Sequence, residues 1–401
     1  MTDFKVRFFN EFATDILTSF YSPIEVDTLK NRLLITKEEE SFYDEFIQNL
    51  IEKNWISTEF KSIDSSQVYF SDISDFSPNY FYSPLGIEIE YTMKCSRNCT
   101  YCAYSSNPTV NTKLELTSED WKKILDDLHK AGVFFIRFTG GDPLTREDFF
   151  ESLAYADKKG FVLSVGTDLT LFTEEDALKF AKLKNLALIQ TTLDGSTKEI
   201  NDKMRGNGNY NKVIEGIKLL NKYRIPFLVG SVLRKSNTND IGNIAKLVGS
   251  LGASGYCFAP LYEAGRGIKV GDEVPTNEDL KHANKQLKEM VEKGFVKPID
   301  WVWYDKMKNT KSAEFESILD NQPFLARIPD KLLRINPQGQ CYSSIKLSRY
   351  VANSEIYCGS IVENSIIDIW HNSENINSMR KMKSEKTFFG QTVDLRQLIN
   401  H

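Results

Sequence analysis

Three of the six cysteines in the chain lie within eight positions, in the segment TMKCSRNCTYCAY at residues 92–104. Cys95, Cys99 and Cys102 are separated by three residues and then by two. Thiolates are soft ligands that suit zinc or iron–sulfur clusters. A structural zinc site usually takes four ligands as two separated pairs, and no second pair or histidine lies nearby. Three thiolates can instead hold three irons of a four-iron cluster and leave the fourth open to a substrate or cofactor.

A second group of candidate residues lies in FFIRFTGGDPL, at residues 134–144. Gly140 and Gly141 allow the backbone to come close to a ligand. The acidic side chain of Asp142, or an exposed carbonyl, can accept hydrogen bonds from an ammonium group. The alternative is a simple turn in which Asp142 and Pro143 begin a helix. Because the cysteine segment precedes it, we favour a ligand-binding role.

Short apolar runs bounded by Gly, Asn or Asp alternate with helical patterns from residue 86 onward. Repeated strand–helix units imply a parallel sheet covered by helices, and six units indicate a partial barrel. In such barrels the chemistry lies at the carboxyl ends of the strands, where both groups of candidate residues fall. The predicted strands are 86–92, 134–139, 161–166, 186–192, 226–233 and 255–260. The predicted helices are 118–131, 146–159, 174–184, 208–224 and 238–251.

The composition excludes several classes of protein. Of the 401 residues, 41% are hydrophobic and 26% are charged, as in soluble globular proteins, and the net charge of −5 does not favour a nucleic-acid surface. The first residues, MTDFKVRFFNEF, resemble neither a signal peptide nor an anchor, and no apolar run is long enough to span a bilayer. We therefore expect a cytoplasmic protein without nucleic-acid or membrane partners. In that reduced compartment, clustered cysteines act as ligands or catalysts rather than as disulfides.

Residues 1–72 predict a small module with the winged-helix-like order of helix, helix and strand. The segment SPIEVDTLKNRL begins with Ser-Pro, a good helix start, and Phe42, Phe46 and Leu50 lie at helical spacing. Turn-forming residues at 73–84 predict a linker. A DNA-binding winged helix and a purely structural cap are the alternatives, and the sparse basic residues argue against DNA.

The pattern changes after residue 260. A helix is predicted at 277–293, the segment KPIDWVWYDK alternates like a strand, and NPQGQ predicts a hairpin within 332–345. The segment IIDIWHNSENINSMRKM predicts a final helix. We therefore predict a separate C-terminal module at 267–401, after a barrel at 85–266.

The spacing Cys-x3-Cys-x2-Cys after a first strand, followed by Gly-Gly-Asp-Pro after a second, resembles the radical S-adenosylmethionine (SAM) enzymes. The resemblance implies one 4Fe–4S cluster on Cys95, Cys99 and Cys102, with an open iron that chelates the amine and carboxylate of SAM. In that family, one electron from the cluster cleaves SAM to a 5′-deoxyadenosyl radical, which abstracts hydrogen from the substrate. This chain departs from the family in having Asp142 where the motif usually has Glu.

The resemblance also implies which residues contact SAM. The third predicted strand ends before Thr167 and Asp168, where the family usually has Thr-Asn-Gly, so the Asn is missing. The segment at 188–220 resembles the peptide-modifying branch, and Arg205 there either pairs with the SAM carboxylate or forms a surface ion pair. Tyr101 is expected to pack on the adenine ring. The implied contacts are Tyr101, Gly140, Gly141, Asp142, Pro143, Thr167, Asp168, Gln190, Thr192, Asp194, Arg205 and Ser231.

The C-terminal module resembles the SPASM or twitch extension of peptide-maturing radical SAM enzymes, through LLRINPQGQCYSSIK and YCGSIVENSIIDIW. That extension normally binds auxiliary clusters, but its first two ligand positions fall near Phe324 and Ser344. We therefore expect the scaffold without auxiliary clusters. The implied fold is α/β: a partial (βα)6 radical SAM barrel with an N-terminal winged-helix-like module and a C-terminal twitch/SPASM-like α+β module.

Three single cysteines remain, Cys257, Cys341 and Cys358. The first interpretation is that all three are small buried hydrophobic residues, as lone cysteines often are. The second is that Cys257 or Cys341 is catalytic and donates a hydrogen atom to a substrate radical, as a thiol does in peptide epimerases of the family. The third, which their spacing disfavours, joins all three in a cluster site.

The resemblance predicts an enzyme that abstracts hydrogen from a residue of a ribosomally made precursor peptide. The peptide leader is expected to bind the N-terminal module by adding a strand to a sheet edge. A flavodoxin or ferredoxin would donate electrons. The outcome is epimerisation, a thioether or a cross-link, and the absence of auxiliary clusters favours epimerisation.

Two other functions stay open from the sequence. One is a radical SAM enzyme that acts on a small molecule, in which residues 1–72 form a cap. The other is a non-enzymatic metal-binding regulatory protein, in which the cysteine segment is degenerate or binds zinc.

Overall fold

The fold is described from a computed structural model of the chain. It divides into two units, residues 1–75 and 76–401, and the architecture below belongs to the second. Nearly all of the winged-helix-like module at 1–72 and of the linker at 73–84 lies outside the described residues, as does the strand in KPIDWVWYDK. The residues that the structure describes are 44, 47–48, 83–84, 86–261, 263–297, 332–343 and 357–378.

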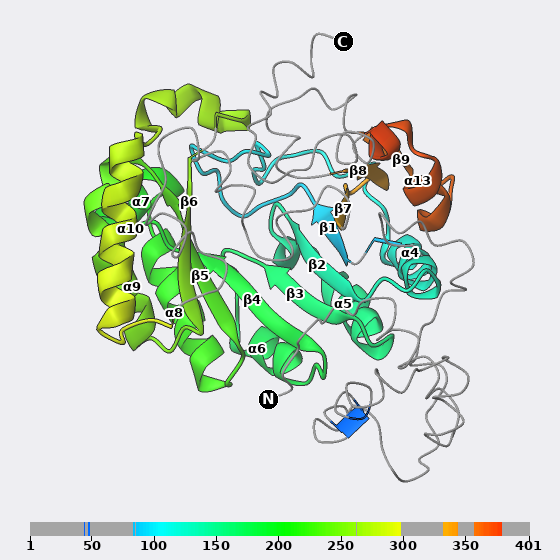
Figure 1. The fold of residues 1–401 in the computed structure, drawn as a ribbon, viewed down its shortest axis with the longest axis horizontal. Helices are drawn as coiled ribbons and strands as arrows, with labels where there is room; N and C mark the ends of the chain where they lie inside the picture. Colours follow the sequence, from blue (N-terminus) through cyan, green and yellow to red (C-terminus); the bar gives the residue numbers. More distant parts are fainter. Residues whose placement is uncertain are drawn as a thin grey trace. The chain divides into compact units, whose positions relative to one another are not determined.

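The centre of this unit is one sheet with the strand order β6-β5-β4-β3-β2-β1-β7-β8-β9 (Figure 1). Strands β1 to β6 are parallel, and each pairs with the next strand along the chain. Their bounds agree with the predicted strands to within one residue, which confirms the α/β fold with a parallel sheet. They are β1 (Gly86–Thr92), β2 (Phe135–Gly140), β3 (Val162–Gly166), β4 (Leu186–Thr192), β5 (Phe227–Leu233) and β6 (Gly255–Pro260).

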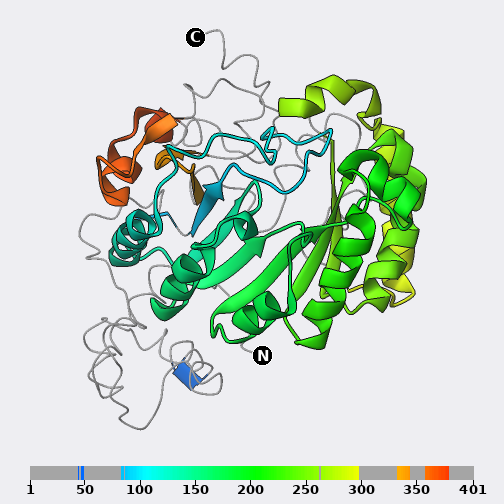
Figure 2. The same ribbon diagram turned by 180° about the vertical axis from the view of Figure 1, so that it is seen from behind.

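Helices follow the strands in turn and lie along the outside of the sheet (Figures 1 and 2). Three of them begin with a threonine capping box, in which a Thr and the Asp three residues later cap each other's backbone amides. No helix in the described part of the chain is long and apolar enough to cross a membrane. The helices are α4 (Ser118–Lys130), α5 (Phe149–Lys158), α6 (Glu174–Ala181), α7 (Lys198–Arg205), α8 (Asn209–Lys222), α9 (Ile241–Ser250) and α10 (Asn277–Glu292), with 3-10 turns η3 (Pro143–Thr145), η4 (Lys235–Asp240) and η5 (Gly265–Glu273).

Helix α7 is the element that the sequence pattern does not predict. Thr197 caps its first turn by accepting from the amide of Ile200, and Gly206 ends it. Of its buried residues only Met204 is apolar, beside Asn201, Asp202 and Arg205, so the helix has too little of an apolar stripe to recognise. Polar groups that hydrogen-bond inside the protein replace the usual hydrophobic face.

One face of the sheet packs against the helices and forms the hydrophobic core. Ile87, Ile89 and Tyr91 of β1 are fully buried on this face, because alternate residues of a strand point to the same side. The Tyr91 ring lies 5.7 Å from the Trp121 ring of α4 and 5.5 Å from the Phe149 ring of α5, measured between centroids. Aromatic packing therefore fixes α4 and α5 on the strands that carry both candidate groups.

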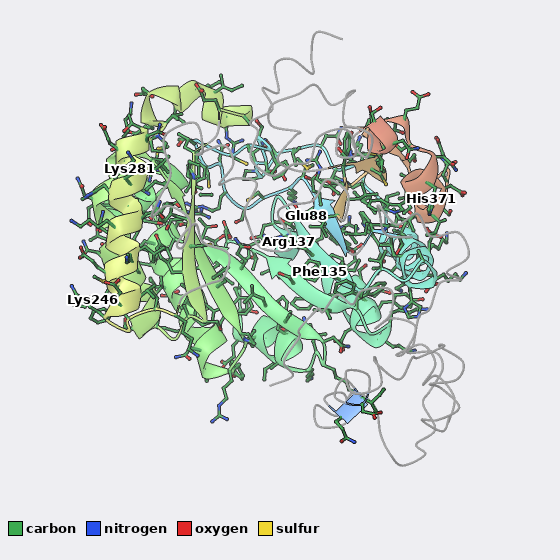
Figure 3. All side chains as sticks on the ribbon, in the orientation of Figure 1. Glu88, Phe135, Arg137, Lys246, Lys281 and His371 are labelled. Atoms are coloured by element: carbon green, nitrogen blue, oxygen red, sulfur yellow. The ribbon has the colours of Figure 1, made fainter. Side chains whose placement is uncertain are left out.

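The other face of the same strands carries polar side chains. Glu88 and Glu90 alternate with the core residues of β1, and Arg137 does so on β2. Glu88 pairs with Arg137 in the strand register, and the two lie side by side in the middle of the sheet (Figure 3). We call this side, turned away from the helices, the inner face.

The C-terminal hairpin extends the same sheet. Strand β7 (Leu332–Ile335) pairs in parallel with β1, and β8 (Gln340–Tyr342) and β9 (Tyr357–Ser360) follow in antiparallel order. The predicted hairpin is therefore joined to the barrel sheet, and Leu333 and Ile335 belong to the core beside β1. Helix α13 (Ile366–Asn372) realises the first part of the predicted final helix. That residues 267–401 form a twitch-like module stays a prediction.

Candidate functional site

The cysteine loop begins directly after β1 and crosses the carboxyl ends of the strands (Figures 1 and 2). Cys95, Cys99 and Cys102 are free thiols, each half-buried. Within the loop, the amide of Cys102 donates to the Cys99 carbonyl over 3.3 Å, and the Cys95 amide donates to the Asn107 carbonyl over 3.2 Å. The three thiols therefore lie on a folded loop at the predicted edge of the sheet.

Two arginines fasten this loop to neighbouring elements. Arg97 donates to the carbonyls of Arg205 and Gly206 at the end of α7, over 2.9 and 2.8 Å. Arg266, at the start of η5, donates to the carbonyls of Cys99 and Ser106, over 2.8 and 2.7 Å. Neither role is readable from a motif, because each arginine binds backbone carbonyls that any residue supplies. The contacts hold the cysteines in place from two sides.

Gly140 and Gly141 bring the end of β2 against the start of the cysteine loop. Gly140 has a φ of +122°, and a Cβ atom there would lie 2.2 Å from the Thr92 carbonyl oxygen. A Cβ at Gly141 would lie 2.0 Å from the Lys94 carbonyl oxygen. The close approach that we expected toward a ligand is therefore made toward backbone, and the glycines position the loop that carries Cys95.

Asp142 is fully buried and points into the protein. Its carboxylate accepts from the Thr167 hydroxyl over 3.0 Å, from the Asp168 amide over 3.1 Å and from the Leu144 amide over 3.0 Å. Burial, followed by the charge of Asp168, raises the pKa of Asp142 well above its ordinary value. Asp142 therefore links the loops after β2 and β3, and its predicted contact to an ammonium group is not what its geometry favours. Pro143 is buried in the same turn and starts η3.

Asp168 offers the acceptor that Asp142 does not. Its Oδ1 accepts from the amide and hydroxyl of Thr170, over 2.9 and 2.6 Å. Its Oδ2 is buried and receives no hydrogen bond from an N–H or hydroxyl group of the described residues, although the Asp142 carboxyl lies close enough to share a proton with Asp168. Burial raises the pKa of the Cys95 thiol, and the Asp168 charge adds to the shift, so the carboxylate lies close to the first cysteine. An unpaired carboxylate oxygen in that position attracts a cation.

Arg205 forms a buried polar group with Asp194 and Tyr101. Its Nη1 donates to the Tyr101 hydroxyl over 2.7 Å and lies 3.4 Å from Asp194 Oδ2, and its Nε donates to Asn209 over 3.0 Å. The Tyr101 hydroxyl also bonds Asp194, whose other oxygen accepts from the Val232 amide. The alternative of a surface ion pair for Arg205 was wrong, because its side chain is only 6% exposed. No partner of Arg205 Nη2 is found in the described part of the chain, so this one nitrogen is left to donate to a carboxylate.

The remaining predicted SAM contacts lie apart from this group. Ser231 bonds the Tyr256 hydroxyl over 2.7 Å on the helix side of the sheet, so it does not face the inner side. Gln190 accepts from Arg137 Nη1 over 2.7 Å on the inner face. Thr192 is half-buried at the end of β4. The structure therefore brings Thr167, Asp168 and the Arg205 group to the cysteine edge, and separates Ser231 from it.

The single cysteines occupy two different environments. Cys341 is completely buried in the core, and Cys358 is nearly so on the neighbouring strand. Cys257 is half-buried on β6, where its sulfur would lie 3.9 Å from a Cβ built on Gly230. A thiol sealed in the core cannot meet a substrate, so the geometry favours Cys257 over Cys341 as a donor. Since β6 and β8 lie at opposite ends of the strand order, a site shared by all three is not formed.

The three clustered thiols fit an iron–sulfur cluster better than a single metal ion. No group of three His, Cys, Asp or Glu side chains among the described residues is arranged to hold one ion. A 4Fe–4S cluster binds each thiolate to a different iron, so its ligands need not converge on one point. Three free thiols on one folded loop, beside an unpaired carboxylate oxygen, match that requirement.

Glu90 gives this region a testable dependence on pH. It is buried on the inner face of β1, and Arg334 Nη1 of β7 lies 3.0 Å from its carboxylate. Burial raises the pKa of Glu90 to about 7 against the pull of Arg334, with Glu88 adding to the shift and Tyr104 opposing it. Between the unfolded value of 4.5 and about 7, the folded state therefore binds more protons. The stability of the wild-type chain should fall as pH rises through that window.

Glu90→Gln removes this titration while keeping the shape of the side chain. Relative to the wild type, the variant should gain stability on the order of 2 kcal/mol as pH rises through the window. Unfolding midpoints of both proteins, measured side by side below and above the window, check this. If the unfolding midpoints of the two proteins change with pH in the same way, the fold does not hold Glu90 in its protonated form.

Comparison with known proteins finds a family match for part of the chain. The model described as the radical SAM superfamily matches residues 89–248. An AdoMet-dependent heme synthase of Methanosarcina barkeri is 32% identical over 198 residues, which are 49% of this chain and 56% of that protein. The mycofactocin maturase MftC of Mycolicibacterium smegmatis is 29% identical over 201 residues, 50% of each chain. The chain thus spans about half the length of the curated relatives it matches.

One likeness extends beyond the barrel. The crystal structure of Streptococcus suis SuiB bound to precursor peptide SuiA matches with a TM-score of 0.65 over 94% of this chain and 85% of that chain. The sequence identity is 15%, so the match shows a shared fold and no more.

Proposed function

Because residues 89–248 form a radical SAM domain, we propose that the chain cleaves SAM and abstracts a hydrogen atom from one residue of a ribosomally made precursor peptide. The domain's cofactors are a 4Fe–4S cluster and SAM. When bound, the cluster supplies the electron that cleaves SAM to a 5′-deoxyadenosyl radical. The residues of the chain hold the two cofactors and position the substrate.

The observation that carries the proposal is the cysteine loop beside unpaired groups of opposite charge. Cys95, Cys99 and Cys102 hold the cluster in this proposal. Asp168 Oδ2, which receives no hydrogen bond from an N–H or hydroxyl group of the described residues, receives the ammonium group of SAM. Arg205 Nη2 donates to the SAM carboxylate, while Nη1 stays bound to Tyr101 and Asp194 and Nε to Asn209. Because the carboxylate and guanidinium are already fixed in the fold, SAM binding requires little reorganisation.

Within this proposal, Cys257 returns a hydrogen atom to the substrate radical, and the outcome is epimerisation. Burial raises the pKa of Cys257 to about 11, and the positive charge of Arg137 opposes that shift. The thiol therefore keeps its hydrogen at neutral pH, as a hydrogen-atom donor must. Breaking the S–H bond forms a C–H bond at the substrate Cα and leaves a sulfur-centred radical. An external one-electron donor such as a flavodoxin or ferredoxin reduces this radical to the thiolate, which takes a proton from solvent.

A peptide substrate is supported by the fold shared with SuiB, a protein solved with its precursor peptide, over 94% of this chain. The N-terminal module would bind the peptide leader. The second candidate is a small-molecule substrate, which the name of the heme synthase relative supports over 49% of the chain. A leader peptide that binds residues 1–72 tightly would distinguish the first from the second.

The proposal is tested with peptides encoded by small reading frames beside the gene, incubated without oxygen with SAM and dithionite in deuterated water. The wild type should add one deuterium at the Cα of a single residue, and Cys257→Ala should still form 5′-deoxyadenosine but lose this label. Cys341→Ala is the matched control and should keep the label. If Cys257→Ala still delivers a labelled Cα, Cys257 is not the donor. If no peptide is altered, the peptide function is contradicted.

A further inference from the structure

Five strands contribute to one continuous row on the inner face. Arg137 of β2 reaches across Gly166 of β3 and donates through Nη1 to Gln190 Oε1 of β4, over 2.7 Å. Gly230 of β5 lies beside Gln190, and Cys257 of β6 lies beyond it. We call Arg137, Gly166, Gln190, Gly230 and Cys257 the inner-face row. Arg137 lies in the middle of the sheet in Figure 3.

Packing does not require a glycine at position 230, because a methyl group would fit there. A Cβ atom there would lie 3.5 Å from Gln190 Nε2, 3.8 Å from the Thr191 carbonyl oxygen and 3.9 Å from Cys257 Sγ. These are ordinary contact distances, and the residue does not have a left-handed backbone. A glycine inside a strand often marks a place where a ligand or another backbone approaches closely. The room for a methyl group at Gly230 borders the amide of Gln190 and the thiol of Cys257.

The row offers hydrogen-bond donors without matching acceptors. Gln190 Oε1 is occupied by Arg137, and its Nε2 has no partner among the described residues. Arg137 Nε makes no hydrogen bond and lies 3.6 Å from Glu88 Oε2. These donors need a hydrogen-bond acceptor. Because the charge of the nearby Glu88 already balances that of Arg137, a neutral carbonyl oxygen suits the row better than a carboxylate.

We propose that Gln190 and Arg137 bind the backbone carbonyl oxygen of the peptide residue to be modified, and so hold its Cα beside Cys257. This rests on the proposed function and adds the group by which the substrate residue is positioned. Gln190 is then a positioning residue for the peptide rather than a contact to SAM. Because residue 230 is a glycine, no side chain stands between the Gln190 amide and the Cys257 thiol, where the Cα would lie.

The test uses the holoenzyme and two small alkylating probes, iodoacetamide and allyl iodide. In iodoacetamide the reacting carbon is attached directly to a carbonyl carbon, as Cα is in a peptide, whereas allyl iodide has no hydrogen-bond acceptor. With both, a sulfur–carbon bond forms, the carbon–iodine bond breaks, iodide leaves and the thiol proton goes to solvent. The reactions are run at mildly alkaline pH, because burial raises the pKa of Cys257 to about 11. Peptide mapping by mass spectrometry reads the labelling of Cys257 alone.

Gln190→Glu replaces the free donor by an acceptor. The ratio of the iodoacetamide rate to the allyl iodide rate at Cys257 should then fall about tenfold. Any change in the thiol pKa affects both rates and cancels in the ratio. An unchanged ratio, or a wild-type Cys257 that reacts with neither probe, overturns the proposal.

Gly230→Ala should slow both probes at Cys257 several-fold, because its methyl group fills the space beside the thiol. Gly242→Ala on α9 is the matched control, since its Cβ would meet Gln286 atoms at 3.5 to 3.9 Å, away from the row. That variant should leave both rates unchanged. Equal rates in the wild type and Gly230→Ala would show that the space does not admit a ligand.

The labelling does not depend on SAM cleavage, so the two proposals fail separately. If labelling behaves as expected while the chain does not cleave SAM, the row binds carbonyl groups and the radical function fails. If SAM is cleaved while the rate ratio is unchanged in Gln190→Glu, the function stands and the row has another role. SAM affinity, measured for the Gln190→Glu variant, distinguishes a role in peptide binding from a role in SAM binding. Weaker SAM binding with an unchanged rate ratio would show that Gln190 contacts SAM instead.

Discussion

Cys99→Ala is expected to abolish SAM cleavage and to lower the bound iron from about four atoms per chain to less than one. Only three thiolates hold the proposed cluster, and each binds a different iron, so the loss of one leaves a cluster with two protein ligands. The cysteine lies in the middle of the loop, where Arg266 fixes its carbonyl oxygen over 2.8 Å. The backbone contact does not depend on the thiol, so the variant should still fold. Iron analysis after anaerobic reconstitution measures the effect.

Cys358→Ala is the matched control for this experiment. Cys358 is a buried thiol on β9, within the hydrophobic core, and it takes no part in the proposed cluster. Its variant should keep the wild-type iron content and the wild-type rate of 5′-deoxyadenosine formation. A Cys99→Ala variant that retains full iron, or a Cys358→Ala variant that loses it, would contradict the assignment of the three ligands.

Gly141→Ala is expected to disrupt the cluster site as severely as Cys99→Ala does, although it removes no cluster ligand. Its Cβ would lie 2.0 Å from the Lys94 carbonyl oxygen and 2.5 Å from the carbonyl carbon, so the backbone before Cys95 must move. The amides of Gly141 and Asp142 also donate to the carbonyls of Thr92 and Lys94, over 2.7 and 2.8 Å, and the shift breaks both bonds. We expect a loss of about 3 kcal/mol in the free energy of unfolding, or more, and little bound iron.

Denaturant unfolding and iron content check this prediction together. Gly242→Ala again serves as the control, because the same added methyl group meets only a side chain at ordinary distances. A Gly141→Ala variant with wild-type stability and iron would show that the glycine pair is required by a ligand rather than by the cysteine loop.

The six parallel strands were predictable because each is a short, apolar segment bounded by turn-forming residues. The parallel order of β1 to β6 follows from strand–helix alternation alone. The place of the cysteine loop follows too, since a loop after a parallel strand lies at the carboxyl edge. Helix α7 was not predictable from periodicity, because polar residues such as Asn201 and Arg205 fill its buried side.

The details of the site could be predicted less well, because they depend on which way a side chain turns. Asp142 and Asp168 are both acidic residues after strands, yet the first is tied by three donors and the second keeps an unpaired oxygen. The pairing of β7 with β1 joins residues more than 240 positions apart, through Arg334 and Glu90 as well as through backbone bonds. The inner-face row depends on the strand register, and no motif in the sequence marks Arg137.

The central claim is that this chain holds one open cluster and uses it to cleave SAM. Its most direct test is to purify the protein without oxygen, reconstitute it, count iron, and measure 5′-deoxyadenosine formed from SAM and dithionite. The account predicts about four irons per chain together with 5′-deoxyadenosine. About eight irons would contradict the single cluster and point to a further cluster in the C-terminal region. Little iron and no cleavage would contradict the radical function itself.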